Sequence, residues 1–137
     1  MALSFAAPVA HEMLKVILAK IDGGTGAGVI RIYAGPVPTS ADAPLAVANT
    51  LLAELTCSDP SADQPAMNTL TLKAINQDAS ANADGDATFF RIGDSALTAV
   101  LQGDCTETGK GGALELNTVK VTANSPVAIT SATFGLA

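Results

Sequence analysis

The chain has 137 residues, which is an ordinary length for one domain, and we expect residues 1–137 to form a single domain. A domain of this size buries about two-thirds of its unfolded surface and needs no disulfide or metal ion for stability. The formal net charge is −6, and the seven lysines and arginines are spread singly along the sequence. This pattern excludes the concentrated basic face that a nucleic acid or an anionic membrane surface requires.

Hydrophobic residues make up 48% of the chain and charged residues only 15%. So little charge leaves part of the surface without a polar coat, which is typical of proteins whose surface another subunit covers. We therefore expect a homo-oligomer, either a dimer or a trimer.

The N-terminal segment predicts an amphipathic helix over residues 7–22. Pro8 suits the first turn of a helix, and Gly23 and Gly24 suit its exit as a left-handed cap. Apolar residues recur at spacings of three and four, at Val9, Met13, Leu14, Val16, Ile17, Leu18 and Ile21. Polar residues share the opposite side, at His11, Glu12 and Lys15. Such a helix either covers an edge or open end of a sheet or forms an arm that packs on a neighbouring subunit.

The same segment predicts neither a signal peptide nor a membrane span. Residues 1–10 place no basic side chain before the apolar run, as a secretory signal would. The longest apolar run is also far shorter than the roughly 20 residues that span a bilayer. We expect the chain to remain in the cytoplasm in which it is made.

From residue 28 onward, short segments with β-type alternation are separated by loops and turns. Alternation predicts strands at 28–35, 50–57, 69–76, 88–92 and 113–122, with further strands near residue 100 and at the C-terminus. Loops are predicted at 36–48, 58–65 and 77–86, and turns at 93–95, 103–104, 109–112 and 124–126. Short connections favour antiparallel pairing, since parallel pairing needs long crossovers. We predict a mainly β fold: an antiparallel β-sandwich or jelly-roll-like barrel of about 7–9 strands, covering 28–137, with one N-terminal α-helix.

Few side chains are suited to catalysis. His11 is the only histidine, so a nucleophilic triad would depend on a residue that we place on the solvated side of the helix, and no G-x-S-x-G motif accompanies it. A zinc site would need further histidines or clustered cysteines. The glycine-rich run at 23–28 joins a helix to a strand, the reverse of a phosphate-binding loop, and we interpret it as a hinge.

Two further groups of residues are candidate redox or metal sites. Cys57 and Cys105 have no CxxC partner, which favours two reduced, partly buried thiols over a disulfide or a redox site. Oxygen-bearing side chains alternate at Asp78, Ser80, Asn82, Asp84 and Asp86. Ala83 and Phe89 stand where a calcium-binding EF-hand loop needs Gly and Glu, so we favour a solvated acidic loop over a nonstandard cation site.

A sugar site is also disfavoured. Carboxylates from distant strands could still pair for glycoside cleavage, but tryptophan is absent and tyrosine occurs once, which leaves no aromatic platform for a sugar. We therefore predict a protein that is not an enzyme, with no catalytic, cofactor-binding or metal-binding residues.

Motifs spread over most of the chain carry a family resemblance. The C-terminal part contains Phe89–Ile92 leading to an Asp94-Ser95 turn, then Val100–Gly103, Leu114–Thr118 and Val127–Thr130. The N-terminal part has a short helix, the strand Ile30–Gly35 with a Pro-rich loop, and Leu51–Leu55. In this order the motifs resemble those of small virion proteins of tailed bacteriophages.

The resemblance implies a β-rich particle component, similar to capsid cement or decoration proteins on the outer shell. We expect a non-enzymatic protein of the virion capsid surface, assembled in the host cytoplasm, that binds the major capsid protein and itself and so stabilises the head. The helix at 7–22 and the loop at 36–48 are the expected contact surfaces. The alternatives are a tail or head–tail connector component and, less favoured, a carbohydrate-binding β-sandwich module.

Overall fold

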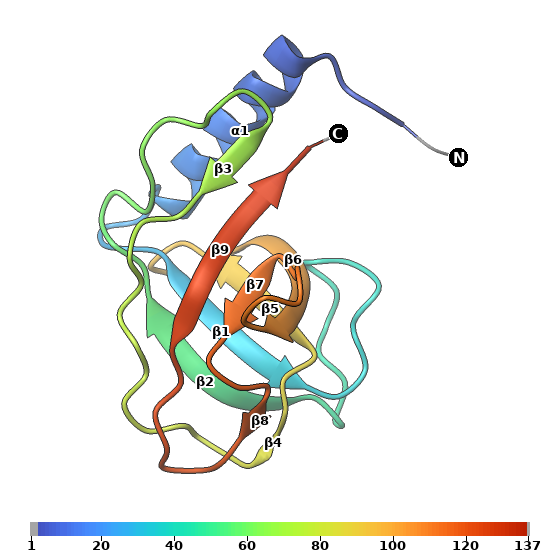
Figure 1. Ribbon diagram of the computed structural model, residues 1–137, viewed down its shortest axis with the longest axis vertical. Coiled ribbons are helices and arrows are strands. Elements are labelled where there is room, and N and C mark those ends of the chain that lie inside the picture. The colour runs from blue at the N-terminus through green and yellow to red at the C-terminus, as the bar shows by residue number, and fades with distance from the viewer. Residues whose placement is uncertain (1–2, 137) are drawn as a thin grey trace.

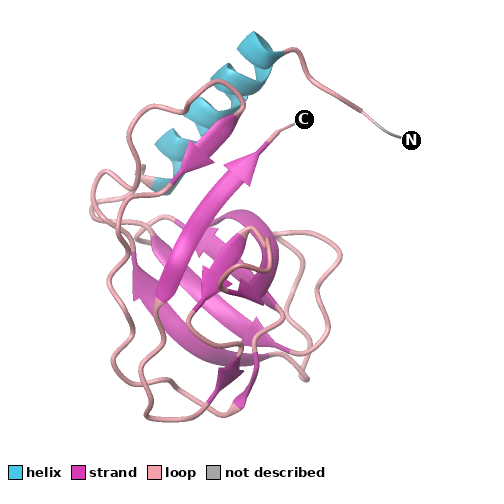
Figure 2. Ribbon diagram, in the orientation of Figure 1, coloured by secondary structure: helices cyan, strands magenta, loops and turns pink. Residues whose placement is uncertain are grey.

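The computed structural model describes residues 3–136, which form one α-helix and nine β-strands (Figure 1 and Figure 2). The helix α1 spans Ala7–Ile21. The strands are β1 (Val29–Ala34), β2 (Thr50–Thr56), β3 (Thr69–Thr71), β4 (Gly85–Asp86), β5 (Phe89–Gly93), β6 (Ala99–Glu107), β7 (Leu114–Leu116), β8 (Lys120–Val121) and β9 (Ile129–Gly135). The mainly β, sandwich-like fold with one N-terminal helix is confirmed.

Seven strands form one mixed sheet in the order β2-β1-β5-β6-β7-β9-β3, and β4 pairs with β8 in a small second sheet. Ile30 of β1 lies between Leu55 of β2 and Ile92 of β5 in register, and all three side chains are buried. Because side chains alternate along a strand, this register places the apolar residues of three neighbouring strands on one face. That face forms the core.

The strands β6 and β7 are parallel neighbours although only residues 108–113 connect them. The prediction of purely antiparallel pairing was therefore wrong here. The connection turns back on itself at Gly109 and Gly111, whose φ angles of 87° and 86° are left-handed. A side chain of β6 then binds the returning backbone, because Gly112 N donates a hydrogen bond of 2.9 Å to Thr106 Oγ1. Two glycines and a side-chain acceptor thus replace the usual long crossover.

The strand β6 also continues through Gly103 and Asp104, where we predicted a turn. Gly103 lies opposite Phe90 of β5 in the ladder. A Cβ atom on Gly103 would lie 2.8 Å from a ring carbon of Phe90, which is closer than real contacts allow. The glycine therefore makes room for a buried ring instead of turning the chain.

The irregular segment 72–82 forms backbone hydrogen bonds on two sides: with the edge strand β2, and with β9 and the residues just before it. On one side, Asn76 N and Asn82 N donate hydrogen bonds of 3.0 and 2.8 Å to carbonyl groups of β2. On the other side, Asp78 and Val127 exchange two backbone hydrogen bonds of 2.9 and 2.8 Å. The segment thus closes the curved sheet without forming a regular strand.

Three other predicted segments differ in detail. The loop predicted at 77–86 was wrong in part, because its end forms β4 and its start belongs to the closing segment. The strand predicted at 69–76 is regular only in β3, and the one predicted at 113–122 is divided into β7 and β8. In each case the segment changes the strand with which it pairs, and a period-two pattern in the sequence does not reveal such a change.

The helix α1 confirms the prediction for 7–22 to within one residue, and it contacts β3, β5 and β6. It lies beside the edge strand β3, at one end of the molecule (Figure 1). The left-handed glycine cap was wrong: Asp22, with φ −88°, follows the last helical residue, and neither Gly23 nor Gly24 has a left-handed φ. Gly28 instead allows close packing, because a Cβ there would lie 2.5 Å from Ile21 Cγ2.

Candidate interaction surfaces

Large apolar side chains that remain exposed are concentrated in two segments of the described chain. We call the first the arm surface; it consists of Leu3, Phe5, Val9, Met13 and Val16. We call the second the loop surface; it consists of Val37, Leu45 and Val47. Among residues 3–136, only Met67 and Leu97 are further exposed side chains of this kind. Val9, Met13 and Val16 lie within the helix, and Val37, Leu45 and Val47 within the loop, that the sequence proposed as contact segments; Leu3 and Phe5 precede that helix.

The arm surface exists because α1 is apolar over a wider arc than the sheet covers. Leu14, Leu18 and Ile21 are buried against the body, whereas Val9 is 51% and Val16 58% exposed. The predicted stripe is therefore only partly buried, since Val9, Met13 and Val16, along one side of it, are exposed. An exposed apolar stripe on a helix is typical of a contact surface.

An open hollow of about 360 Å³ lies beside the arm surface, between α1 and the turn from β5 to β6. Its helical wall consists of Val16, Ile17 and Lys20, and its other wall includes Asp94 and Val100. The hollow is mainly apolar, with one basic and one acidic group among the residues that line it. Its size and lining suit a single large apolar side chain.

His11 lies on the other side of α1 from the arm surface. It is half-buried, not solvated as predicted, and its Nδ1 is buried without a hydrogen-bond partner among the described residues. Because α1 lies against the body, even its polar side is partly covered.

The loop surface is carried by a loop that side chains of the sheet hold in place. Arg91 Nη2 donates hydrogen bonds of 3.2 Å to Ser40 O and 2.7 Å to Ala43 O. Gln102 Nε2 donates a third, of 3.0 Å, to Pro38 O, while its Oε1 accepts from Arg91 Nε at 2.9 Å. A planar guanidinium with several donors is well suited to hold two carbonyl groups at once. The predicted loop at 36–48 is thus anchored over β5 and β6.

Asn49 fixes the base of the same loop. Its Nδ2 donates to Ala34 O at 3.1 Å and to Pro36 O at 2.8 Å, and its Oδ1 accepts from Ala46 N at 2.8 Å. One amide group thereby joins the two ends of the loop. The exposed apolar side chains of the loop are thus presented from a constrained backbone, which lowers the entropy lost on binding.

The anchored loop also explains a buried aromatic pair on the non-core face of the sheet. Tyr33 and Phe89 stack with ring centroids 5.2 Å apart and are 6% and 0% exposed. Phe89 shares its face of β5 with Arg91, because residues two apart on a strand point the same way. Arg91 therefore holds the loop on the face where these two rings lie.

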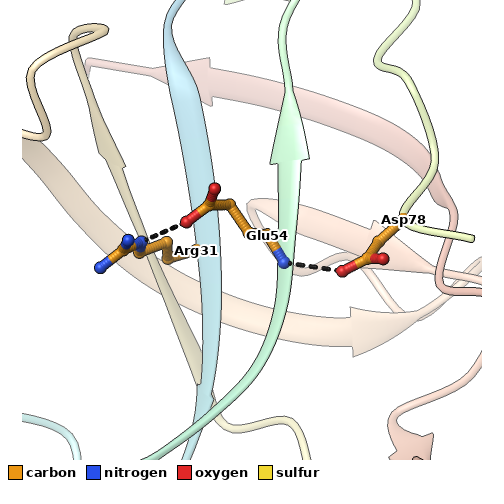
Figure 3. Close-up of polar contacts among 3 residues, drawn as sticks. All are labelled: Arg31, Glu54 and Asp78. Carbon is orange, nitrogen blue, oxygen red and sulfur yellow. Dashed lines mark hydrogen bonds and ion pairs between the residues drawn. The ribbon is translucent and has the colours of Figure 1, made fainter. Parts of the chain in front are cut away.

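A second polar group lies on β1 and β2 (Figure 3). Arg31 Nε donates a 2.7 Å hydrogen bond to Glu54 Oε2, and Glu54 N donates a 3.0 Å bond to Asp78 Oδ2. Burial lowers the pKa of Arg31, but its hydrogen bonds with Glu54 and Tyr33 outweigh burial, and the pKa is raised. The group is therefore a charged pair plus a carboxylate that satisfies a backbone amide.

The alternating oxygens at 78–86 have mainly structural partners. Asp78 Oδ1 accepts from Ser80 N at 3.0 Å, and Asp84 Oδ1 accepts from Ala123 N at 2.7 Å. Within residues 3–136, no three His, Cys, Asp or Glu side chains come together as a metal site would require. The structure assigns these carboxylates to backbone amides.

Both cysteines are free and buried, Cys57 directly after β2 and Cys105 in β6. Burial, with a smaller effect from Asp22, raises the pKa of Cys57 to about 11. Burial, with a smaller effect from Asp104, raises the pKa of Cys105 to about 12. Both thiols therefore stay protonated at neutral pH and lack the thiolate character of a redox site.

The glycine-rich run at 23–28 packs against the turn that follows β5. Gly26 N donates a 3.3 Å hydrogen bond to Ser95 Oγ, and a Cβ on Gly24 would overlap that same oxygen. Close packing, and not only flexibility, therefore explains these glycines.

No protein-family model, curated protein or solved structure matches this chain. In the part of the chain that the structure describes, no helix is long and apolar enough to cross a bilayer.

The sequence indicated the helix at 7–22 and the loop at 36–48 as contact segments, which stays a prediction, but it missed the residues that hold the loop in place. Arg91, Gln102 and Asn49 are ordinary polar residues whose roles depend on partners up to 64 positions away. The one local signal was Arg91, a charged residue between the buried Phe90 and Ile92 on the opposite face of its strand.

Proposed function

We propose that this chain is a non-enzymatic structural protein of a tailed-phage virion that binds the major capsid protein and stabilises the assembled head. The observation that carries the proposal is the loop surface: three exposed apolar side chains on a loop that the sheet holds in place. The resemblance of the sequence motifs to virion proteins supplies the identity of the partner.

The anchoring of the loop supports binding over a merely flexible connection. Exposed apolar groups are costly for a protein with few charges unless a partner covers them. Val47 is fully exposed, at 106% of its reference area, so it contributes nothing to the packing of this chain. An anchored loop loses little conformational entropy when a partner covers it, so more of its apolar contact appears as affinity.

The proposed mechanism depends on many weak contacts. A loop of this size offers only a modest apolar area, far below that of an independent tight interface. On a capsid lattice, however, each copy that contacts several neighbouring subunits gains effective concentration from the contacts already made. Binding to assembled heads is therefore expected to be much tighter than binding to a free capsid subunit.

The test uses heads that lack this protein, incubated with the purified chain and then sedimented. We expect saturable binding on the order of hundreds of copies per head, as avidity on a lattice predicts. Val47→Asp should weaken binding at least about 10-fold, because a buried carboxylate would replace a valine worth about 1.5 kcal/mol or more. Met67→Asp, an exposed apolar residue outside both surfaces, is the matched control and should bind normally.

Three results would contradict the proposal. Equal binding by the Val47→Asp variant and the wild-type chain would remove the loop surface from the contact. A native virion that contains tens of copies or fewer, measured by quantitative gel densitometry, would indicate a tail or connector component instead. Retention on a glycan array without binding to heads would favour the carbohydrate-binding alternative.

A further inference from the structure

The arm surface is an apolar stripe that leads away from the body of the protein. Val9, Met13 and Val16 follow the i, i+4, i+7 spacing and so lie on one line along α1. Phe5 is 39% exposed and precedes the helix, in a segment that leaves the helical conformation at Ala6 (φ −57°, ψ 140°), so it is an apolar side chain at the N-terminal end of the stripe. Figure 2 shows the edge strand β3 beside this part of the helix, so one side of α1 is covered there and Ala10 is fully buried. Val9, Met13 and Val16 lie on the exposed side of the helix, where a partner can reach them.

The stripe is complementary to itself when two copies run antiparallel. A two-fold axis near Met13 places Val9 of one copy against Val16 of the other, and Met13 against its own equivalent. Such an interface is isologous, with the same contact made twice. In the same arrangement, the N-terminal end of one helix, which Phe5 precedes, lies beside Lys20 near the C-terminal end of the other.

The hollow beside Lys20 is the feature that fits this arrangement. It has apolar walls from Val16, Ile17 and Val100, and Lys20 and Asp94 among its lining residues. Its volume of about 360 Å³ is ample for a phenyl ring. An aromatic side chain seated in an apolar pocket is the usual anchor of a protein interface. Each copy thus carries both the anchor and the hollow that receives it.

Charge beside the stripe is partly neutralised within each copy. Glu12 lies next to the stripe and forms an exposed ion pair of 3.5 Å with Lys15 of the same chain, with side chains 72% and 43% exposed. Such a pair is weak, but it reduces the repulsion between the two Glu12 carboxylates that the two-fold axis brings together.

The available area is sufficient for a specific but modest dimer. At roughly 100 Å² for each half-exposed apolar side chain, the five residues of the arm surface offer about 500 Å² per copy, or about 1,000 Å² in total, near the lower end for specific complexes. The chain has no basic cluster near the arm that would favour an anionic lipid surface. We infer that two copies of this chain pair through their α1 helices in antiparallel orientation, with Phe5 of each copy in the hollow of the other. The inference concerns the protein alone and needs no capsid.

Cysteine cross-linking tests the orientation directly. A disulfide needs Cα atoms within about 7 Å. In the proposed dimer, Val9 of one copy is adjacent to Val16 of the other, whereas equivalent Val9 residues are about 10 Å apart along the helix axis, from the 1.5 Å rise per residue. Under mild oxidation, a mixture of Val9→Cys and Val16→Cys chains should therefore give a cross-linked dimer, and each variant alone should not. The native Cys57 and Cys105 are buried and protonated, so they give little background.

Sedimentation of the unmodified chain provides a second measurement. The wild-type chain should form a concentration-dependent dimer, and Met13→Glu should raise its dissociation constant at least about 100-fold by placing two carboxylates at the two-fold axis. Met67→Glu is the matched control and should dimerise normally. Circular dichroism should show unchanged helix content, since Met13 is 36% exposed in the single chain.

Several outcomes would overturn the inference. Cross-linking of Val9→Cys with itself would indicate parallel helices. A wild-type chain that remains monomeric at high concentration would exclude the dimer, as would binding of lipid vesicles or heads through the arm in place of a second copy. A chain that stays monomeric but binds heads normally contradicts only this inference. A chain that dimerises but does not bind heads contradicts only the proposed function.

Discussion

Leu97 adopts the strained backbone conformation of a tight turn. Asp94 Oδ1 accepts hydrogen bonds from both Ala96 N and Thr98 N at 3.0 Å and closes the turn after β5. Within this closed turn Leu97 adopts a φ of 67°, in the left-handed region that a branched side chain disfavours. The sequence predicted the turn from Gly93, Asp94 and Ser95, but not that the strain would lie at Leu97.

Replacing Leu97 by Gly should therefore stabilise the protein. A left-handed backbone costs a non-glycine residue about 1–2 kcal/mol, and glycine loses about 0.5–1 kcal/mol more on ordering, which leaves a gain of about 0.5–1 kcal/mol in the free energy of unfolding. Urea denaturation measures the change. Leu97→Ala is the control, because it removes the side chain but keeps the strain. A glycine variant less stable than the alanine variant would contradict this account.

At the scale of elements, β6 shows why glycine is an ambiguous signal. Gly103 and Asp104 have turn-type composition, and the sequence divided the strand there. In the structure β6 is continuous, and Phe90 of the neighbouring strand occupies the space that a side chain at position 103 would need. Glycine permits both a turn and a close approach, and only the position of the neighbouring strand decides between them.

Substitution at this position should consequently be costly. Gly103→Ala would place a methyl group against the Phe90 ring, which stacks on Phe134 with centroids 5.8 Å apart. Overpacking of this kind costs about 1–3 kcal/mol in the free energy of unfolding. Thermal and urea denaturation should show the loss. Gly26→Ala is the matched control, because a Cβ there makes only an ordinary contact at 3.9 Å and should be nearly neutral. Equal effects at both positions would refute the packing explanation.

The helix shows a different limit of prediction from sequence. Its bounds were predicted well, because Pro8 and the apolar periodicity are local signals. Which part of the apolar arc is buried was not predictable, since that depends on where β3, β5 and β6 lie. For the same reason the sequence did not predict the arm surface, most of which consists of the helical apolar residues that the sheet leaves exposed.

At the scale of the whole molecule, the closing segment 72–82 determines how the sheet ends. Asp78 contributes most there: its backbone pairs with Val127, while its carboxylate accepts from Glu54 N of β2 and from Ser80 N. One residue thus connects segments that lie 24 and 49 positions away along the chain.

Loss of the Asp78 carboxylate should weaken the closure. Asp78→Ala leaves the amides of Glu54 and Ser80 without their acceptor, and we expect the free energy of unfolding to fall by about 1–3 kcal/mol. Hydrogen exchange should also become faster at Glu54, which distinguishes local opening from a general loss of stability. Asp63→Ala is the control, because that side chain is 90% exposed and forms only a 3.4 Å ion pair with Lys73. No change at the Glu54 amide would contradict the proposed role.

By itself, the sequence determined what depends on near neighbours: one helix, a mainly β body and the positions of most turns. Period, turn composition and helix signals act over a few residues, so they can be read directly. The tertiary structure alone decided the parallel pair β6–β7, the closure by 72–82, the buried face of α1 and the anchoring of loop 36–48 by Arg91. Each of these depends on contacts between residues far apart in sequence, and such contacts exist only once the whole chain has packed.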